Sequence, residues 1–237
     1  MFYFDKVLGK TVLKSDKMPV EHFFTTRELV LKTKEEDNLI FSLKNRELLI
    51  KEFNLISLVT PEQRHTSNIS FVESDKTEYK ETDALILDKK GMGIFLNFAD
   101  CTPVILYDKR NNIAAISHAG WRGTVQKIAV KTVEKMNSNP KDIIALIGPC
   151  ICFDCFETSD EIADMLLKTV DKKDGLLKKI NGKFHADLKG VNKRQLEEKG
   201  IKEIDTAPFC TCCNNDKFFS YRKENKTTNR MSAFISL

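Results

Sequence analysis

Residues 84–118, ALILDKKGMGIFLNFADCTPVILYDKRNNIAAISH, decide the fold. This stretch contains short apolar runs separated by polar turns, a pattern that predicts buried β-strands. The runs are residues 84–87, 94–98, 104–107 and 113–117. The last two flank a polar loop and have similar lengths, so we predict that they pair as an antiparallel hairpin.

The remaining elements mix strands and helices without a repeating order. Apolar runs predict strands at residues 23–27, 55–59 and 143–147, and a terminal hairpin of Phe218–Tyr221 with Met231–Ile235. Helical spacing and capping residues predict helices at 39–53, at 125–133 with Thr124 as N-cap, at 158–170, and at 187–200 with Asp187 as N-cap. An irregular series of this kind favours the α+β class over a doubly wound sheet.

Composition narrows the classes of function. The chain has 237 residues, 41% of them hydrophobic, and a net charge of +4 with lysines spread along its length. This distribution predicts a solvated surface and no nucleic-acid groove. We find no signal peptide and no apolar run long enough to cross a membrane, so we expect a cytoplasmic protein. The seven cysteines are then expected to be thiols or metal ligands. Nothing in the sequence indicates an oligomeric state.

Cys101 and His118 are the first candidates for chemistry. Cys101 precedes one strand of the expected hairpin and His118 follows the other, so the two side chains should lie side by side at one end of the sheet. Such a pair can be a nucleophile with its base or two metal ligands, and both interpretations stay open here. Asp100, next to Cys101, could orient an imidazole or accept a proton.

A glycine-rich turn follows His118. Gly120 and Gly123 flank Arg122 where a strand is expected to lead into a helix. Free backbone N–H groups and a guanidinium at such a turn predict a phosphate site, whereas Trp121 is expected to anchor the core.

Several short motifs together resemble one known family. They are ADCTPV at 99–104, HAGWRGT at 118–124, IGPCI at 147–151, FHADL at 184–188, CTCC at 210–213, FFSYR at 218–222 and TNRM at 228–231, the last with Asn229 where the family has glycine. The chain is thereby similar to the polyphenol oxidase or laccase-domain family, also called YfiH-like, purine nucleoside phosphorylase and peptidoglycan-editing factor. The resemblance implies a single domain over residues 1–237, with a mixed, mostly antiparallel sheet core layered between helices.

The resemblance also implies a zinc site made of His65, Cys101 and His118. Arg64 replaces a small apolar residue of the family beside His65, which removes no ligand. Two imidazoles and one thiolate leave a coordination position open, as in catalytic zinc sites, although the same set suits copper. We favour zinc because a cytosolic, thiol-rich protein is a poor setting for a copper oxidase. The implied reactions are phosphorolysis of adenosine, inosine, guanosine and methylthioadenosine, and deamination of adenosine, with Asp100 moving the proton.

Other interpretations remain. Cys101 and His118 could form a thiol hydrolase, such as a peptidoglycan-precursor editing enzyme; a copper polyphenol oxidase and a structural zinc module are further alternatives. Arg222 could bind an anion or hold the terminal hairpin through an ion pair. The remaining cysteines have a C-x-C-x-x-C spacing that is not a standard zinc knuckle, so we predict packed thiols there and no second metal. They are Cys150, Cys152, Cys155, Cys210, Cys212 and Cys213.

Overall fold

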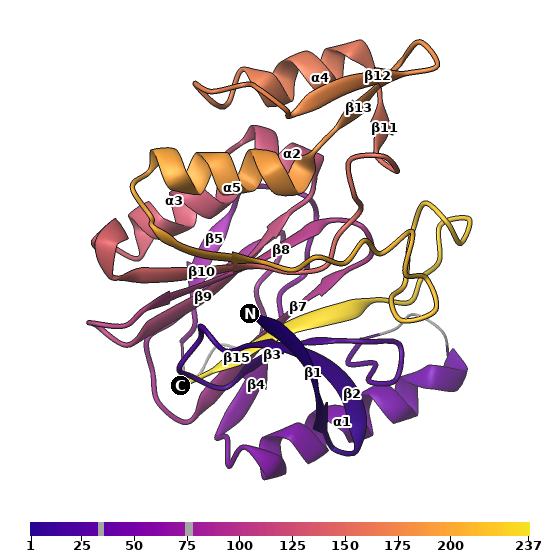
Figure 1. The fold of residues 1–237 in the computed structure, drawn as a ribbon. Helices are drawn as coiled ribbons and strands as arrows, with labels where there is room; N and C mark the ends of the chain where they lie inside the picture. Colours follow the sequence, from indigo (N-terminus) through magenta and orange to yellow (C-terminus); the bar gives the residue numbers. More distant parts are fainter. Residues whose placement is uncertain (33–35, 74–77) are drawn as a thin grey trace.

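Two β-sheets packed face to face form the centre of the computed structural model, which describes residues 1–32, 36–73 and 78–237. Within these residues each of the two central sheets has six strands, and a third sheet has three. The chain is of the α+β class, as predicted from its irregular mixture of elements (Figure 1). No helix of the described part combines the length and apolar character needed to span a membrane.

The first sheet gathers both ends of the chain. Its C-terminal strand is central, pairing antiparallel with β3 on one side and β7 on the other. In spatial order the strands are β1 (Phe2–Val7), β2 (Lys10–Ser15), β3 (His22–Thr25), β15 (Met231–Ser236), β7 (Met92–Phe98) and β4 (Ser57–Val59).

The second sheet contains the predicted hairpin. Strands β8 and β9 are antiparallel and central, while the two edge strands run parallel to their neighbours. In spatial order the strands are β14 (Glu203–Thr206), β10 (Ile143–Ile147), β8 (Thr102–Asp108), β9 (Ile113–Ala119), β6 (Ala84–Leu87) and β5 (Ile69–Phe71).

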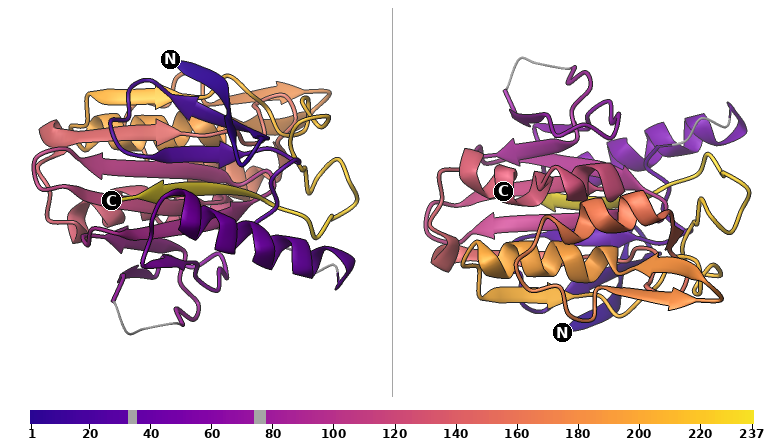
Figure 2. Two further views of the ribbon diagram at one scale, coloured as in Figure 1. Left: turned by 90° about the horizontal axis from the view of Figure 1, so that it is seen from below. Right: turned by 90° about the horizontal axis from the view of Figure 1, so that it is seen from above.

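Helices cover the outer faces of both central sheets. Figure 2 shows α1 against one face and α3 with α5 against the other, which gives helix–sheet–sheet–helix layers. Beyond α5, α4 packs with the small sheet of β11, β13 and β12 (Figure 1). The helices are α1 (Glu36–Glu52), α2 (Trp121–Val125), α3 (Ile128–Lys135), α4 (Asp160–Leu167) and α5 (Leu188–Glu198), with a 3-10 turn at Pro140–Asp142; the small strands are β11 (Glu157–Thr158), β12 (Leu177–Ile180) and β13 (Lys183–Ala186).

The layered arrangement explains why residues 84–118 contain continuous apolar runs. Every residue of β6, β7 and β8 is buried, because one side of each strand faces the opposite sheet and the other faces a helix layer or loops. Leu96 and Ile105 meet in the core between the sheets. Phe95 packs under α1, and Leu106 packs under α3. Strands covered on both faces lose the alternation of apolar and polar residues.

Two local predictions were wrong. Thr124 is not an N-cap: α2 starts after Gly120, and the chain breaks at Lys127, whose φ of 55° is left-handed, before α3 begins. Residues 218–221 are irregular and form no strand, because the backbone N–H of Phe218 bonds to the Asn214 carbonyl and that of Phe219 bonds to Met231 Sδ. The C-terminal strand pairs with β3 and β7 instead.

The aromatic contact under α1 allows a test of this packing. Phe234 is fully buried, and its ring stacks on that of Phe23 with centroids 4.4 Å apart. We expect Phe234→Ala to lower the free energy of unfolding by about 3–5 kcal/mol, because it leaves a cavity between sheet and helix. Phe41, which is 66% exposed, is the matched control, and its alanine variant should lie within about 0.5 kcal/mol of wild type. Urea unfolding measures both, and equal losses would contradict the packing described.

Candidate metal centre

The hairpin places Cys101 and His118 together. Thr102 pairs with Ala119 and Pro103 pairs with His118 across β8 and β9, which confirms the predicted pairing. Cys101 directly precedes β8, so its side chain lies at the same sheet end as His118. This end opens on a cavity, whereas the other end of the hairpin closes in the loop after Asp108.

His65 completes a triangle of donor atoms. It lies in the segment between β4 and β5, and its Nε2 is 3.8 Å from Cys101 Sγ. The rings of His65 and His118 have centroids 4.8 Å apart. One donor atom from each of the three residues lies within 4.8 Å of the others, a spacing that one metal ion can bridge. His65 has a φ of 61°, so the local backbone is held in a left-handed conformation that few residues adopt.

Asp83 holds both histidines in place. Its buried carboxylate accepts a hydrogen bond from His118 Nδ1 at 2.8 Å and from the backbone N–H groups of Arg64, His65 and Thr66. Burial alone would raise the pKa of Asp83, but the His118 contact and the backbone donors lower it to about 2. With Nδ1 engaged, His118 presents Nε2 toward the thiol, the arrangement usual for a metal-binding histidine.

Sequence reasoning missed Asp83. The residue directly precedes β6, which pairs with β9 so that Ala84 lies opposite Ser117 and Asp83 faces His118. The sequence signal for Asp83 was a carboxylate directly before an apolar strand. Its meaning depends on which strand lies alongside, and the sequence pattern alone did not predict that β6 neighbours β9.

The thiol and the imidazole strongly influence each other. Burial opposes ionisation of Cys101, but the neighbouring His118, helped by His65, lowers the pKa of the thiol to about 6. Burial also disfavours the charged form of His118, yet the Cys101 thiolate and Asp83 raise its pKa to about 9. These opposite shifts favour the pair of thiolate and imidazolium over the neutral pair of thiol and imidazole. A thiolate serves both a metal ligand and a nucleophile, so this ionisation does not separate the two interpretations.

Two glycines of the turn after β9 allow the triangle to close. A Cβ on Gly120 would lie 2.8 Å from Cys101 Sγ and 3.3 Å from His65 Cδ2. A Cβ on Gly123 would lie 2.8 Å from the His118 carbonyl oxygen. Both positions thus need glycine because ligand residues approach closely.

The triangle lies in the wall of a cavity of about 710 Å³, a size typical of small-molecule sites. Of the predicted site residues, the structure brings His65, Asp100, Cys101, His118 and Arg222 to this cavity. Arg122 is exposed, and its guanidinium lies over the Trp121 ring at 4.2 Å. Neither Arg122 nor the two glycines are among the described residues that line the cavity.

Asp100 contributes a carboxylate to the cavity wall but does not contact the imidazole of His118. Its Oδ1 accepts a hydrogen bond from the Thr211 hydroxyl at 2.6 Å, and its Oδ2 accepts one from the backbone N–H of Arg222 at 2.7 Å. Its φ of 79° is left-handed, which turns the chain sharply before Cys101. Asp100 therefore ties β8 to the loops that carry Thr211 and Arg222.

The donor set fits a metal ion with one open coordination position. Two imidazoles and one thiolate provide three protein ligands of the types that bind zinc, and three is the number found in catalytic zinc sites. A blue-copper centre adds a weak axial methionine, and none of the described residues lining the cavity is methionine. Met92 begins β7, whereas Cys101 follows the other end of that strand. The cavity lining therefore offers no methionine among the described residues as an axial copper ligand.

Comparison with known proteins identifies a family. Residues 21–237 match the family described as multi-copper polyphenol oxidoreductase laccase. Purine nucleoside phosphorylase YlmD of Bacillus subtilis is 32% identical over 213 residues, which cover 82% of this chain and 77% of that protein. Adenosine deaminase RL5, from an unknown prokaryotic organism, is 34% identical over 186 residues, 72% of this chain and 71% of that one.

The fold agrees with a solved structure. The crystal structure of YlmD from Geobacillus stearothermophilus superposes with a TM-score of 0.88 at 26% identity, covering 98% of each chain. The match extends over both central sheets and the helices that cover them, so the layered arrangement described above is shared.

Asp83 provides a test of the centre. We expect Asp83→Asn to weaken zinc binding by about 10- to 100-fold, because the amide no longer fixes the tautomer and orientation of His118. Competition with a chromophoric chelator measures the affinity, and circular dichroism checks that the variant is folded. Asp88→Asn, on an exposed residue after the same strand, is the control and should bind zinc like wild type. A folded Asp83→Asn protein with unchanged affinity would contradict this role.

Proposed function

The chain belongs to the multi-copper polyphenol oxidoreductase laccase family, and from that membership and its cavity we propose that it is a zinc enzyme acting on purine nucleosides. The proposed reactions are phosphorolysis, which releases the purine and forms ribose 1-phosphate, and deamination of adenosine. The names of its relatives support both reactions. The observation that carries the proposal is the triangle of His65, Cys101 and His118 in the wall of a cavity large enough for a nucleoside.

His65, Cys101 and His118 are the proposed ligands. When bound, zinc supplies Lewis acidity at the edge of the cavity. The chain's part is to hold two nitrogens and one sulfur in a fixed triangle, through Asp83 on the imidazole side and Gly120 on the thiolate side. An ion held in this way requires little rearrangement when substrate enters.

One wall of the cavity suits a purine. Trp121, Phe156 and Tyr221 contribute aromatic surface there, and Ile151 and Leu188 contribute aliphatic surface. A flat base gains dispersion and stacking contacts against such a wall. The lining also includes Gln63 and Asn97, whose side chains contact each other, with Gln63 Nε2 also donating to the Asn97 carbonyl at 2.8 Å. We propose that the base lies against the aromatic wall, with its reacting edge toward the metal.

Asp100 is the proposed proton carrier. It is the one carboxylate among the described residues that line the cavity. Each of its oxygens accepts one hydrogen bond from a neutral donor, which leaves lone pairs on both for a proton. In deamination a proton must pass from water to the departing ammonia, and in phosphorolysis the leaving purine needs a proton or a hydrogen bond. A carboxylate beside the metal ligand Cys101 can serve both reactions.

Arg230 and Arg222 are the proposed phosphate contacts. Both line the cavity. Arg222 is held by hydrogen bonds to the carbonyls of Cys155 and Glu157, each at 3.1 Å. Arg230 is partly buried near Asp100 and Cys101, and burial lowers the pKa of its guanidinium, which nevertheless remains charged. A desolvated arginine binds an anion more strongly than an exposed one, which favours Arg230 over the exposed Arg122, whereas Arg222 is exposed and is proposed for its place in the cavity lining.

A direct assay tests the proposal. The purified zinc-loaded protein should release adenine from adenosine only when phosphate is present, and should release ammonia from adenosine without phosphate. Inosine, guanosine and methylthioadenosine are the further substrates to compare for base release. The absence of both reactions with all four nucleosides would overturn the proposal.

A second candidate function rests on one observation. Cys101, His118 and Asp83 also form the nucleophile, base and orienting carboxylate of a thiol hydrolase, because Asp83 bonds to His118 on the side away from the thiol. His65 is the residue that this alternative leaves without a role. A peptidoglycan-precursor editing enzyme belongs to this class.

Arg230→Gln tests the phosphate contact. We expect the KM for phosphate to rise roughly ten- to a hundredfold, as one charge-assisted hydrogen bond of about 1.5–3 kcal/mol is lost. Deamination should change far less because phosphate takes no part in it. Arg122→Gln is the matched comparison: the larger effect there would place phosphate at the exposed turn instead, and equal loss of both reactions in Arg230→Gln would contradict a phosphate role.

Alkylation separates zinc chemistry from thiol chemistry. A metal-bound thiolate reacts slowly with iodoacetamide, whereas a free thiolate beside His118 should be the fastest of the seven cysteines. We expect chelation to abolish turnover and expose Cys101, and added zinc to restore both activity and protection. Peptide mass spectrometry assigns the labelled site. Rapid labelling of Cys101 in the untreated enzyme, or turnover without metal, would favour the hydrolase.

A further inference from the structure

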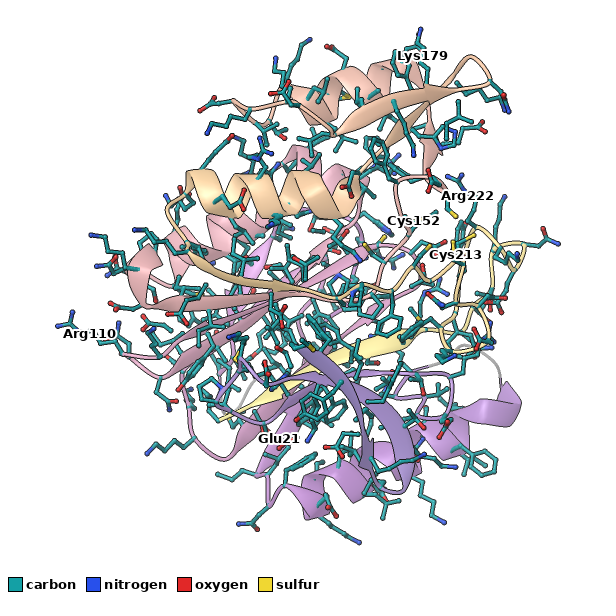
Figure 3. The ribbon with its side chains drawn as sticks, in the orientation of Figure 1. Glu21, Arg110, Cys152, Lys179, Cys213 and Arg222 are labelled. Atoms are coloured by element: carbon teal, nitrogen blue, oxygen red, sulfur yellow. The ribbon has the colours of Figure 1, made fainter. Side chains whose placement is uncertain are left out.

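Four cysteine sulfurs gather at a second place in the molecule. Cys152 and Cys155 lie in the loop after β10, and Cys210 and Cys213 lie in the loop after β14. All four Sγ atoms lie within 4.8 Å of one another. Figure 3 shows Cys152 and Cys213 near Arg222, on the side of the molecule where these loops meet.

The sulfur spacing matches ligands around one ion. Cys155 Sγ lies 3.5 Å from Cys213 Sγ, and Cys152 Sγ lies 3.9 Å from it. A disulfide would need about 2.05 Å. Four sulfurs placed tetrahedrally at about 2.3 Å from zinc are separated by roughly 3.8 Å. The observed separations agree with the tetrahedral arrangement and not with a bonded pair.

The four clustered cysteines form two C-x-x-C pairs in the sequence. Cys150 is fully buried and its thiol points to the Ile151 carbonyl, so it stays out of the cluster. Cys212 is also outside the four. Removing these two leaves residues 152 and 155 with 210 and 213, the paired spacing of zinc knuckles. The four thiols are packed together, as predicted from the sequence, but their geometry leads us to depart from the prediction that no second metal binds there.

Backbone donors support a charged sulfur at Cys210. The N–H of Cys152 points to Cys210 Sγ at 3.2 Å, and the N–H of Cys213 points to it at 3.3 Å. Hydrogen bonds of this kind stabilise a thiolate and orient it toward a metal. The Arg222 guanidinium, bonded to the Cys155 carbonyl, adds positive charge beside the loop.

We propose that Cys152, Cys155, Cys210 and Cys213 bind one zinc ion as a structural site. Four thiolates complete a tetrahedral shell and leave no position for substrate, unlike the centre at Cys101. Binding releases the thiol protons to solvent and joins two loops that are distant in sequence.

Both joined loops support the wall that carries Asp100. The N–H of Ile151 donates to the Asp100 carbonyl at 3.0 Å, and the Thr211 hydroxyl donates to its Oδ1. Ile151 directly precedes Cys152, and Thr211 directly follows Cys210. The second zinc would therefore hold the two loops that position Asp100.

Metal content of the reduced, purified protein tests the site. We expect two zinc ions per chain in wild type and one in Cys213→Ser, which removes the exposed ligand. Cys212→Ser is the matched control and should keep two. Cys101→Ser should lose the other ion and keep this one, so failure of either site is seen separately. Equal zinc content in Cys213→Ser and wild type, or iron in place of zinc, would overturn the proposal.

Cobalt substitution gives a second measurement, made on wild type and on Cys101→Ser. Cobalt added in place of zinc should produce the intense charge-transfer absorption of a tetrathiolate site, and Cys101→Ser should retain most of it. Intact-mass analysis should show no loss of hydrogens to disulfides. A spectrum that disappears in Cys101→Ser, or a mass showing disulfides among these cysteines, would contradict the site.

Discussion

The buried carboxylate of Asp83 is the constraint on which the candidate centre depends. A charge without solvent is costly unless it is fully hydrogen-bonded, and Asp83 satisfies this need with His118 and three consecutive backbone N–H groups. The same contacts fix His65 in its left-handed conformation and fix the imidazole of His118. One side chain therefore sets two corners of the triangle, and the β8–β9 hairpin sets the third at Cys101.

Asp100 joins this centre to the rest of the cavity. Its neighbour Cys101 belongs to the triangle, while its own backbone and carboxylate hold Ile151, Thr211 and the N–H of Arg222. The residues proposed to hold the two zinc ions are thus both linked to this one acidic residue. One ion would serve the chemistry, and the other would keep the loops around Asp100 in place. With both ions bound, the cavity wall at Asp100 would be tied on both sides.

Local pattern predicted much of the fold, and long-range pairing accounts for what it missed. The strands at 84–87 and 143–147 have their predicted bounds, since apolar runs bounded by turns leave little choice. The hairpin that brings Cys101 to His118 was predicted correctly from two apolar runs of similar length on either side of a polar loop. Asp83 was missed because the pairing of β6 with β9 is set by the tertiary structure and cannot be read from the local sequence pattern. The aromatic run near Phe218 resembled a strand, but Phe218 and Phe219 are buried in an irregular segment whose backbone N–H groups bond to Asn214 and Met231.

Anomalous diffraction at the zinc absorption edge, from crystals of protein purified without added metal, tests the central claim most directly. We expect a peak within bonding distance of Nε2 of His65, Sγ of Cys101 and Nε2 of His118, with Asp83 still hydrogen-bonded to Nδ1 of His118. A peak at the copper edge in that position would contradict the choice of metal. No peak within bonding distance of these three atoms would contradict the metal centre itself.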